Sequence, residues 1–484
     1  MRFRFQLGSL MVQETCIVPK NDLAGRFIKS LSEKFPPIVS HGIRVIFGAG
    51  PWDCKLYNAC REGSRLNLGD FQLPGFVVRA TVLSFVLQVA AIGALHTYRF
   101  RTTDNHFAFG WEMGCIGKAL AQGRGFSDPF CVPSGPSAWE PPLYPYLIAV
   151  VFSTCGIYSR GSAWALLTIN SLFASLTSIP IYLIATKTWS VKVGRWATWT
   201  WALLPYTWYW SIHWIWDTTL SPFLLSCIFL FALELQEWLG VRAWLLFGAL
   251  WGVAALLNPS LLSFLPFSGL WAWNRRRKRA LQSLVGVVLA SLVFGMIVSP
   301  WLVRNYRLFG RFVFVRDDFG QQLRLGNGPE AHGRSMVYEQ PNLNPVELER
   351  FRAMGELRYG EDRGREAKTF VRENPVTFLV LSLKRFFYYW ASVPKPDDGW
   401  LVAILRRSVF LASSALTFWG LARALCRKLE GAWLFALLLL SYPAIYYVVY
   451  PHARYRHPIE PEMIILIIAA LVGQTADSAQ NSTT

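Results

Sequence analysis

The segment FVVRATVLSFVLQVAAIGALHTY, residues 76–98, decides the fold class of this chain. It is longer than the roughly 20 apolar residues that a helix needs to cross the hydrocarbon core of a bilayer. The whole chain of 484 residues has a matching composition, with 53% hydrophobic and only 16% charged residues, against about 25% charged residues in an average soluble domain. The sequence therefore predicts an integral membrane protein and excludes a soluble enzyme, a collagen-like fibre and a disordered tail protein.

Further apolar segments follow the first one, and together they predict ten membrane crossings. They occupy residues 162–186, 196–215, 218–238, 243–257, 260–273, 281–301, 401–424, 431–450 and 459–473. Basic residues cluster at 187–195, 275–279 and 423–428. The positive-inside rule puts such clusters on the cytoplasmic side, and ten crossings with a cytoplasmic N-terminus satisfy all three. The same rule accounts for the net charge of +18, so we expect no nucleic-acid partner.

The predicted crossings divide the chain into four parts. Residues 1–75 are expected to be a cytosolic extension that is poorly structured or translated from an over-long gene start. Residues 76–301 form a transmembrane module that we expect to be catalytic, with a first extracytoplasmic loop at 98–161. Residues 302–400 form a second extracytoplasmic loop, and residues 401–484 hold the last spans and a short cytosolic tail.

Two shorter apolar stretches, 143–158 and 376–392, are expected to lie at the membrane interface without crossing it. In the second, apolar residues recur at helical spacing while polar residues fill the opposite face, a pattern typical of interfacial helices. Asn-Pro pairs at 374–375 and 344–345 predict helix starts, because proline is favoured in the first turn of a helix. Another Asn-Pro pair, at 258–259, predicts a kink between two short apolar segments.

The predicted spans contain almost no charged residues, since Arg79, Asp217 and Glu234 all lie near predicted ends. Proton- and sodium-coupled transporters usually carry ionisable residues inside their spans, because such residues mark the ion pathway. Their scarcity argues against an ion-coupled transporter and directs attention to the outer loops.

Carboxylates near the expected outer face are candidates for acid–base chemistry, although most loop carboxylates are simply solvated. They are Asp104, Glu112, Asp128, Glu140 and Asp217. Glu112 borders an apolar stripe formed by residues 111–120, where partial desolvation raises the pKa of a carboxyl group and makes it a better base near neutral pH. Asp217 lies among tryptophans at the same face, either as a catalytic group or as the N-cap of the next span.

Two cysteines of the first loop, Cys115 and Cys131, can pair in an oxidising compartment or remain two buried thiols. Basic residues at the outer face are Arg304, Arg454, Arg456 and His457. Because positive charge is disfavoured there as an orientation signal, a phosphate is the natural partner for them, through the bidentate fork of arginine. Anionic lipid headgroups are the alternative partner.

Three motifs together resemble the polytopic glycosyltransferases of the GT-C fold, which use polyprenyl-phosphate sugar donors. They are the region from Glu112 through GRGF (123–126) to PPLYP (141–145), the segment PWLVRNYRLFGRF (300–312), and RYRHPIEP (454–461). The similarity is nearest to bacterial relatives of dolichyl-phosphate-mannose protein mannosyltransferases and of the lipid A aminoarabinose transferase, and it covers roughly residues 76–473.

The resemblance implies a helical membrane bundle in which a first-loop acidic residue is the general base. The matching position is Glu112, with Asp104 as a rival because such families more often have aspartate there. Asp217 is implied to assist, and the four basic residues of the outer face are implied to hold the lipid phosphate. No cofactor is expected. Aminoarabinose- and mannosyl-transferring relatives imply no catalytic metal, whereas oligosaccharyltransferases of the same broad fold use one; no His/Asp ligand cluster in this sequence calls for a metal.

We therefore expect a multi-pass protein of the inner (plasma) membrane whose active site faces the extracytoplasmic side. It would transfer a sugar, with inversion, to a lipid, glycan or protein acceptor. The main alternative is a flippase for polyprenyl-linked sugars, which would favour mid-span polar residues and two related halves, neither of which the sequence contains. A catalytically inactive protein with the same fold is the remaining alternative.

Overall fold

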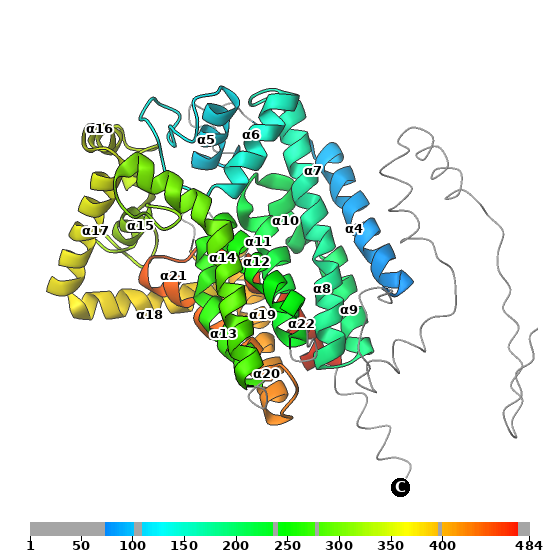
Figure 1. Ribbon diagram of the computed structural model, residues 1–484. Coiled ribbons are helices and arrows are strands. Elements are labelled where there is room, and N and C mark those ends of the chain that lie inside the picture. The colour runs from blue at the N-terminus through cyan, green and yellow to red at the C-terminus, as the bar shows by residue number, and fades with distance from the viewer. Residues whose placement is uncertain (1–72, 101–108, 236–240, 276–279, 395–398, 473–484) are drawn as a thin grey trace, which may run out of the picture. The chain divides into compact units, whose positions relative to one another are not determined.

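A computed structural model describes residues 73–100, 109–235, 241–275, 280–394 and 399–472 of the chain. All regular elements within these residues are helices (Figure 1). The first half contains α4 (Gly75–Ala94), α5 (Glu112–Ala121), α6 (Leu143–Cys155), α7 (Arg160–Leu176), α8 (Ser178–Thr188), α9 (Val191–Leu203), α10 (Pro205–His213), α11 (Leu220–Glu234), α12 (Val241–Leu257) and α13 (Leu265–Arg275). The second half contains α14 (Ala280–Phe309), α15 (Phe319–Gly326), α16 (Pro345–Met354), α17 (Glu356–Glu373), α18 (Pro375–Ala391), α19 (Trp400–Cys426), α20 (Ala432–Ser441), α21 (Ala444–Val448) and α22 (Glu460–Val472).

Helices occupy all ten segments that the sequence assigns to membrane crossings. Among the described residues, five helical stretches are long and apolar enough to span a membrane: Gly75–Ala94, Arg160–Thr188, Asp217–Glu234, Leu284–Phe309 and Trp400–Cys426. Three further apolar helices are shorter. The chain is thus an α-helical membrane protein, while the number of crossings remains a prediction.

The bundle helices pack closely through small and polar residues. A Cβ atom on Gly248 of α12 would lie only 2.2 Å from the backbone oxygen of Ala290 on α14, so glycine is what lets these two helices approach. Gln88 of α4 donates hydrogen bonds to Ser175 of α7 (3.1 Å) and accepts one from Ser211 of α10 (2.5 Å). Because the polar atoms of Gln88 are satisfied inside the protein, a buried amide on the first span is tolerated and ties three helices together.

The predicted breaks and starts of helices are confirmed at three Asn-Pro pairs. α12 ends before Asn258, whose side chain accepts a hydrogen bond from the Ser260 amide (3.1 Å). α16 begins at Pro345, where the Asn344 side chain caps the first turn, and α18 begins at Pro375. In each case proline lacks the amide hydrogen that a helix interior needs, so it is accommodated in the first turn.

Helices α15 to α18 form a group at one end of the bundle, and α18 runs across the direction of α14 in the view of Figure 1. Val376, Leu379 and Leu383 of α18 are exposed, while Leu381 and Arg385 are buried. This separation of an apolar exposed face from a buried face agrees with the interfacial helix predicted from the sequence.

The first loop is covalently closed, because Cys115 of α5 and Cys131 form a disulfide. The alternative of two buried thiols is therefore wrong. The bond links the helix that begins at Glu112 to the loop segment leading to Ser137 and Trp139, so it restrains the part of the chain that carries the candidate base.

Candidate active site

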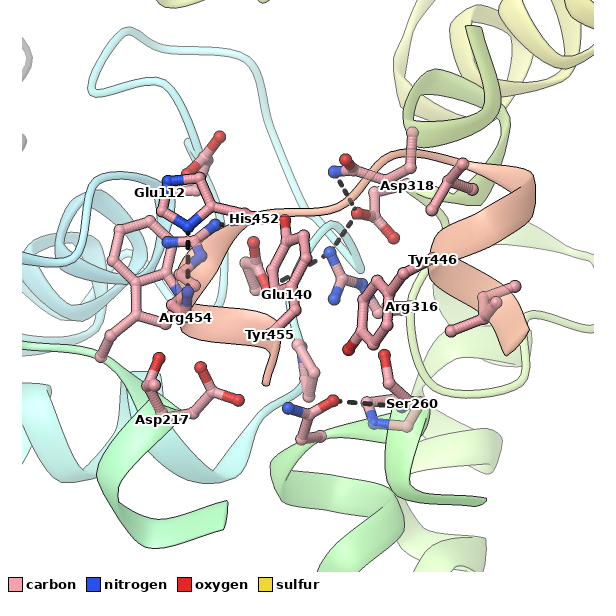
Figure 2. A pocket seen from close by; sticks show the side chains of 18 of the residues that line it. Glu112, Glu140, Asp217, Ser260, Arg316, Asp318, Tyr446, His452, Arg454 and Tyr455 are labelled. Carbon is pink, nitrogen blue, oxygen red and sulfur yellow. Dashed lines mark hydrogen bonds and ion pairs between the residues drawn. The ribbon is translucent and has the colours of Figure 1, made fainter. Parts of the chain in front are cut away.

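A pocket of about 580 Å³ lies where the first loop, the ends of several helices and the second loop meet (Figure 2). Four carboxylates line it, namely Glu112, Glu140, Asp217 and Asp318. Two arginines, Arg316 and Arg454, line it as well, together with aromatic side chains that include Trp216, Tyr446 and Tyr455. Acidic, basic and aromatic groups of distant segments therefore share one partly enclosed space.

Glu112 is the first residue of α5 and is only 6% exposed. Burial raises the pKa of its carboxyl group to about 7, although the positive charges of Arg454 and Arg316 oppose part of this rise. A carboxylate is favoured at a helix N-terminus, where the helix dipole is positive. The desolvation that the apolar stripe predicted is confirmed, and at neutral pH Glu112 is poised to accept a proton.

Asp217 lies on the opposite wall, beneath Arg454 in the view of Figure 2. It opens a short 3-10 helix, Asp217–Thr219, and the residue that precedes α11 is Thr219. The interpretation of Asp217 as the N-cap of that span is therefore wrong. Ser221 donates hydrogen bonds to the backbone oxygen (3.0 Å) and a carboxylate oxygen (3.5 Å) of Asp217, which hold the buried carboxylate at the pocket wall.

Arg454 lies in the pocket close enough to both Glu112 and Asp217 for its charge to act on each of them. Its guanidinium carbon lies 4.0 Å from the ring centre of Trp216, and its Nη2 donates to the Tyr455 hydroxyl (3.4 Å). Its positive charge acts on both Glu112 and Asp217 and lowers the pKa of Glu112. Flat stacking on tryptophan leaves the edge of a guanidinium available for hydrogen bonds, which suits the recognition of a phosphate.

Arg316 lies across the pocket in an ion-paired group with Asp318 and Glu140 (Figure 2). Its Nη2 is 3.6 Å from Glu140 Oε2, and Gln322 donates to Asp318 Oδ2 (2.7 Å). Burial raises the pKa of Glu140 well above its usual range, and the charges of Asp318, Glu112 and other carboxylates add to the rise while Arg316 opposes it. Arg316 therefore balances only part of the negative charge that is buried on this side of the pocket.

The other three basic residues of the predicted phosphate site do not line the pocket. Arg304 donates to the backbone oxygens of Ser137 (2.6 Å) and Phe126 (2.8 Å). Arg456 bonds to Glu460 (3.2 Å) beneath the ring of Phe410. These arginines hold backbone or paired side chains in place, so their guanidinium groups are directed away from the pocket.

His457 is fully buried, and its Nδ1 lies 2.7 Å from Glu460 Oε2. The remaining predicted site residue, Asp104, lies outside the described residues. Of the predicted acids and cations, the structure thus brings together Glu112, Asp217 and Arg454, with the candidate carboxylate Glu140 in the same pocket.

Sequence reasoning missed Arg316 and Asp318, and it gave Glu140 no role beyond that of a candidate. The available signal was the string VRDDFG (315–320), an arginine next to two acids directly after an apolar run. Within the described residues, no group of three or more His, Cys, Asp or Glu side chains is arranged to hold a metal ion. The expectation of a metal-independent reaction remains a prediction.

Comparisons with known proteins agree with this architecture. Residues 139–303 match the family model described as dolichyl-phosphate-mannose-protein mannosyltransferase. The oligosaccharyltransferase of Archaeoglobus fulgidus, solved in complex with Zn and sulfate, is 16% identical with a TM-score of 0.50, over 84% of this chain and 49% of that chain. Its apo form is 13% identical with a TM-score of 0.50, over 84% and 52%. ArnT from Cupriavidus metallidurans in the apo state is 13% identical with a TM-score of 0.31, over 82% and 79%.

The family match and the two oligosaccharyltransferase structures confirm the resemblance to GT-C glycosyltransferases that three sequence motifs indicated. At such low identities the solved structures show the fold alone, and that fold is the GT-C type. The chain spans about half the length of the oligosaccharyltransferase chains that it matches. No curated protein sequence matches the chain significantly.

Proposed function

We propose that this protein is a membrane glycosyltransferase that moves one sugar from a polyprenyl-phosphate donor to an extracytoplasmic lipid, glycan or protein acceptor. The observation that carries the proposal is the pocket in which the buried acids Glu112 and Asp217 face Arg454 and Arg316. The family match over residues 139–303 supports the donor class. The sugar transferred is a hexose or a pentose.

The proposed reaction is a single displacement at the anomeric carbon. Glu112 accepts the proton of the acceptor hydroxyl while the hydroxyl oxygen of the acceptor forms a bond to the anomeric carbon. The bond between the carbon and the phosphate oxygen breaks, and the phosphate leaves with the electron pair. Because one attack from the opposite face replaces the leaving group, the anomeric configuration inverts. Asp217 assists by holding the acceptor and by keeping Arg454 in place.

The departing polyprenyl phosphate gains negative charge, which needs a positive partner inside a desolvated site. We assign this role to Arg454, helped by Arg316. Arg454 carries it because its face is stacked on Trp216 within the pocket, whereas Arg304 and Arg456 are engaged elsewhere. Relative to the sequence prediction, the proposed phosphate site therefore loses Arg304, Arg456 and His457 and gains Arg316.

We further propose that the pocket opens on the extracytoplasmic side of the plasma membrane. The disulfide between Cys115 and Cys131 supports this side, since disulfides persist in oxidising compartments and are rare in the cytosol. The basic clusters at 187–195 and 423–428 favour the same orientation through the positive-inside rule.

The test is sugar transfer in reconstituted vesicles that contain a panel of polyprenyl-phosphate sugars and an envelope-lipid extract. Glu112→Gln is expected to abolish transfer while the protein remains folded and still binds the donor. Glu349→Gln is the matched control, because Glu349 is an exposed outer-loop residue on α16. Transfer retained in Glu112→Gln would remove Glu112 as the base, and donor that crosses the bilayer without transfer would identify a flippase.

A further inference from the structure

The backbone at Ser137 and Ala138 is a junction where three parts of the chain meet. Arg304 of α14 donates to the Ser137 backbone oxygen (2.6 Å). The Asp317 amide donates to the Ala138 backbone oxygen (2.9 Å). Glu356, the first residue of α17, accepts from the Ser137 hydroxyl (2.6 Å) and from the Ala138 amide (2.5 Å). We refer to these contacts as the 137–138 junction.

The junction lies directly beside the ion-paired group of the pocket. Glu140 follows Ala138 by two residues, and Asp317 separates Arg316 from Asp318. The hydrogen bond between Asp317 and Ala138 holds two segments of the chain at a fixed distance. One segment carries Arg316 and the other carries Glu140, whose side chains form an ion pair (3.6 Å). Any shift of residues 137–138 moves one partner of this pair relative to the other.

Glu356 is placed for this contact by the local structure of the second loop. Gly355 separates α16 from α17 and has a φ of 76°, in the left-handed region that favours glycine. The turn leaves Glu356 8% exposed against the first loop. Next to it, Trp139 packs against Phe351 of α16 with ring centres 5.5 Å apart, so an apolar contact supports the polar one.

We propose that Glu356 is a positioning residue of the transferase, which through the 137–138 junction holds Glu140 and Arg316 in the geometry that receives the donor phosphate. The inference rests on the proposed function. Glu356 touches neither the donor nor the acceptor; it acts through two hydrogen bonds that it accepts. Small displacements of groups that bind a transition state cost up to about 100-fold in rate, which gives a residue outside the pocket a measurable effect.

Two substitutions of Glu356 distinguish the effect of its hydrogen bonds from the effects of its charge and its volume. Methionine has a similar length and volume but accepts neither bond, so Glu356→Met is expected to lower kcat/KM for the donor by about ten- to 100-fold, with kcat falling more than KM rises. Glutamine can accept from the Ala138 amide and donate to the Ser137 hydroxyl oxygen, so Glu356→Gln is expected to remain within about threefold of wild type. Glu361→Met is the matched control on the same helix, since Glu361 is exposed and forms a surface ion pair with Arg311 (2.7 Å).

Hydrogen exchange measured by mass spectrometry gives a readout that does not depend on activity. Glu356→Met is expected to speed exchange in peptides that cover residues 137–140 and 313–319 and to leave α7 unchanged, whereas Glu361→Met changes neither region. If Glu356→Met does not fold, Ser137→Ala removes one of the two bonds and is expected to act in the same direction, by at least about threefold in kcat/KM.

Several results would overturn the proposal. Unchanged kcat and KM of folded Glu356→Met would assign it a purely structural role, whatever the thermal stability. An equal loss in Glu356→Gln would show that charge acts instead of hydrogen bonding. Absence of sugar transfer by the wild-type protein would refute the proposed function, and exchange at 137–140 would still decide whether Glu356 orders the junction.

Discussion

Burial and nearby positive charge have opposing effects on the pKa of Glu112. Burial raises the pKa of the Glu112 carboxyl group to about 7, although Arg454 and Arg316 lie close enough to oppose the shift. A base with a pKa near the working pH is both sufficiently deprotonated and sufficiently basic. In the proposed reaction, the same pocket would provide a proton acceptor and cations for an anionic leaving group without requiring either to be exposed.

The pH dependence of transfer follows from this shift. Because Glu112 works in its deprotonated form, kcat/KM is expected to rise with pH and to level off above an apparent pKa near 7. Below that value the rate should fall about tenfold per pH unit. The apparent value belongs to the carboxylate group as a whole, since Glu140 and Asp318 interact with Glu112. Transfer measured from pH 5 to 9 checks this, and a flat profile would contradict a base of raised pKa.

A comparison of two neighbouring arginines tests the phosphate site. Arg454→Ala is expected to raise the donor KM by about tenfold or more, because it removes a charge-assisted contact inside the pocket. Arg456→Ala is expected to lower thermal stability, since it leaves Glu460 without one partner, and to change the donor KM less. Donor titrations and unfolding curves of both variants separate these effects. An equal rise of KM in both would return Arg456 to the donor site.

Helix pairs owe their fit to a few small residues. α12 and α14 approach so closely that a Cβ atom on Gly248 would meet the backbone of Ala290. A Cβ atom on Gly295 of α14 would instead lie in open space. Sequence periodicity places both glycines in apolar segments and does not distinguish them. The two glycines differ in the space around them because only one face of α14 packs against α12, which is a feature of the tertiary structure.

A glycine-to-alanine substitution is therefore expected to affect protein stability differently at these two positions. Gly248→Ala is expected to destabilise the protein by roughly 1–3 kcal/mol, because backbone must move to admit the methyl group. Gly295→Ala is expected to be neutral or slightly stabilising, since alanine favours a helix and meets nothing. Thermal unfolding in one detergent measures both. Equal effects would mean that α12 and α14 do not pack as described.

The chain as a whole brings its proposed catalytic groups together in one pocket. The first loop, the second loop and the segment around Arg454 all contribute to one pocket, although they are far apart in the sequence. Only a folded bundle brings such segments together, and the hydrogen bonds at Ser137 and Ala138 join the two loops directly. The orientation of the bundle is what makes this pocket extracytoplasmic in our proposal.

Cysteine labelling in intact cells tests that orientation. With the other free cysteines replaced by serine, a Glu349→Cys variant is expected to react with a membrane-impermeant maleimide from outside, because position 349 is exposed in the second loop. Exposed Cys426 is the last residue of α19, next to a basic cluster, and is expected to react only after permeabilisation. Labelling of both, or the reverse pattern, would contradict the proposed topology.

The sequence by itself determined the class of the protein, the helical segments and part of the site. Apolar length predicts spans because a bilayer has a fixed thickness, and the Asn-Pro pairs mark helix starts because proline restricts its own backbone. The burial of Glu112 agrees with its position at the border of an apolar stripe that is local in sequence.

Only the tertiary structure decided which charged residues meet. The sequence assigns Arg304, Arg454 and Arg456 to the same phosphate site, yet Arg454 lines the pocket while the other two bind backbone or Glu460. The pairing of Arg316 with Glu140 and the contact of Glu356 with Ser137 likewise join loops separated by many residues. Such contacts depend on how helices cross and where loops return, which side-chain periodicity along one segment does not encode.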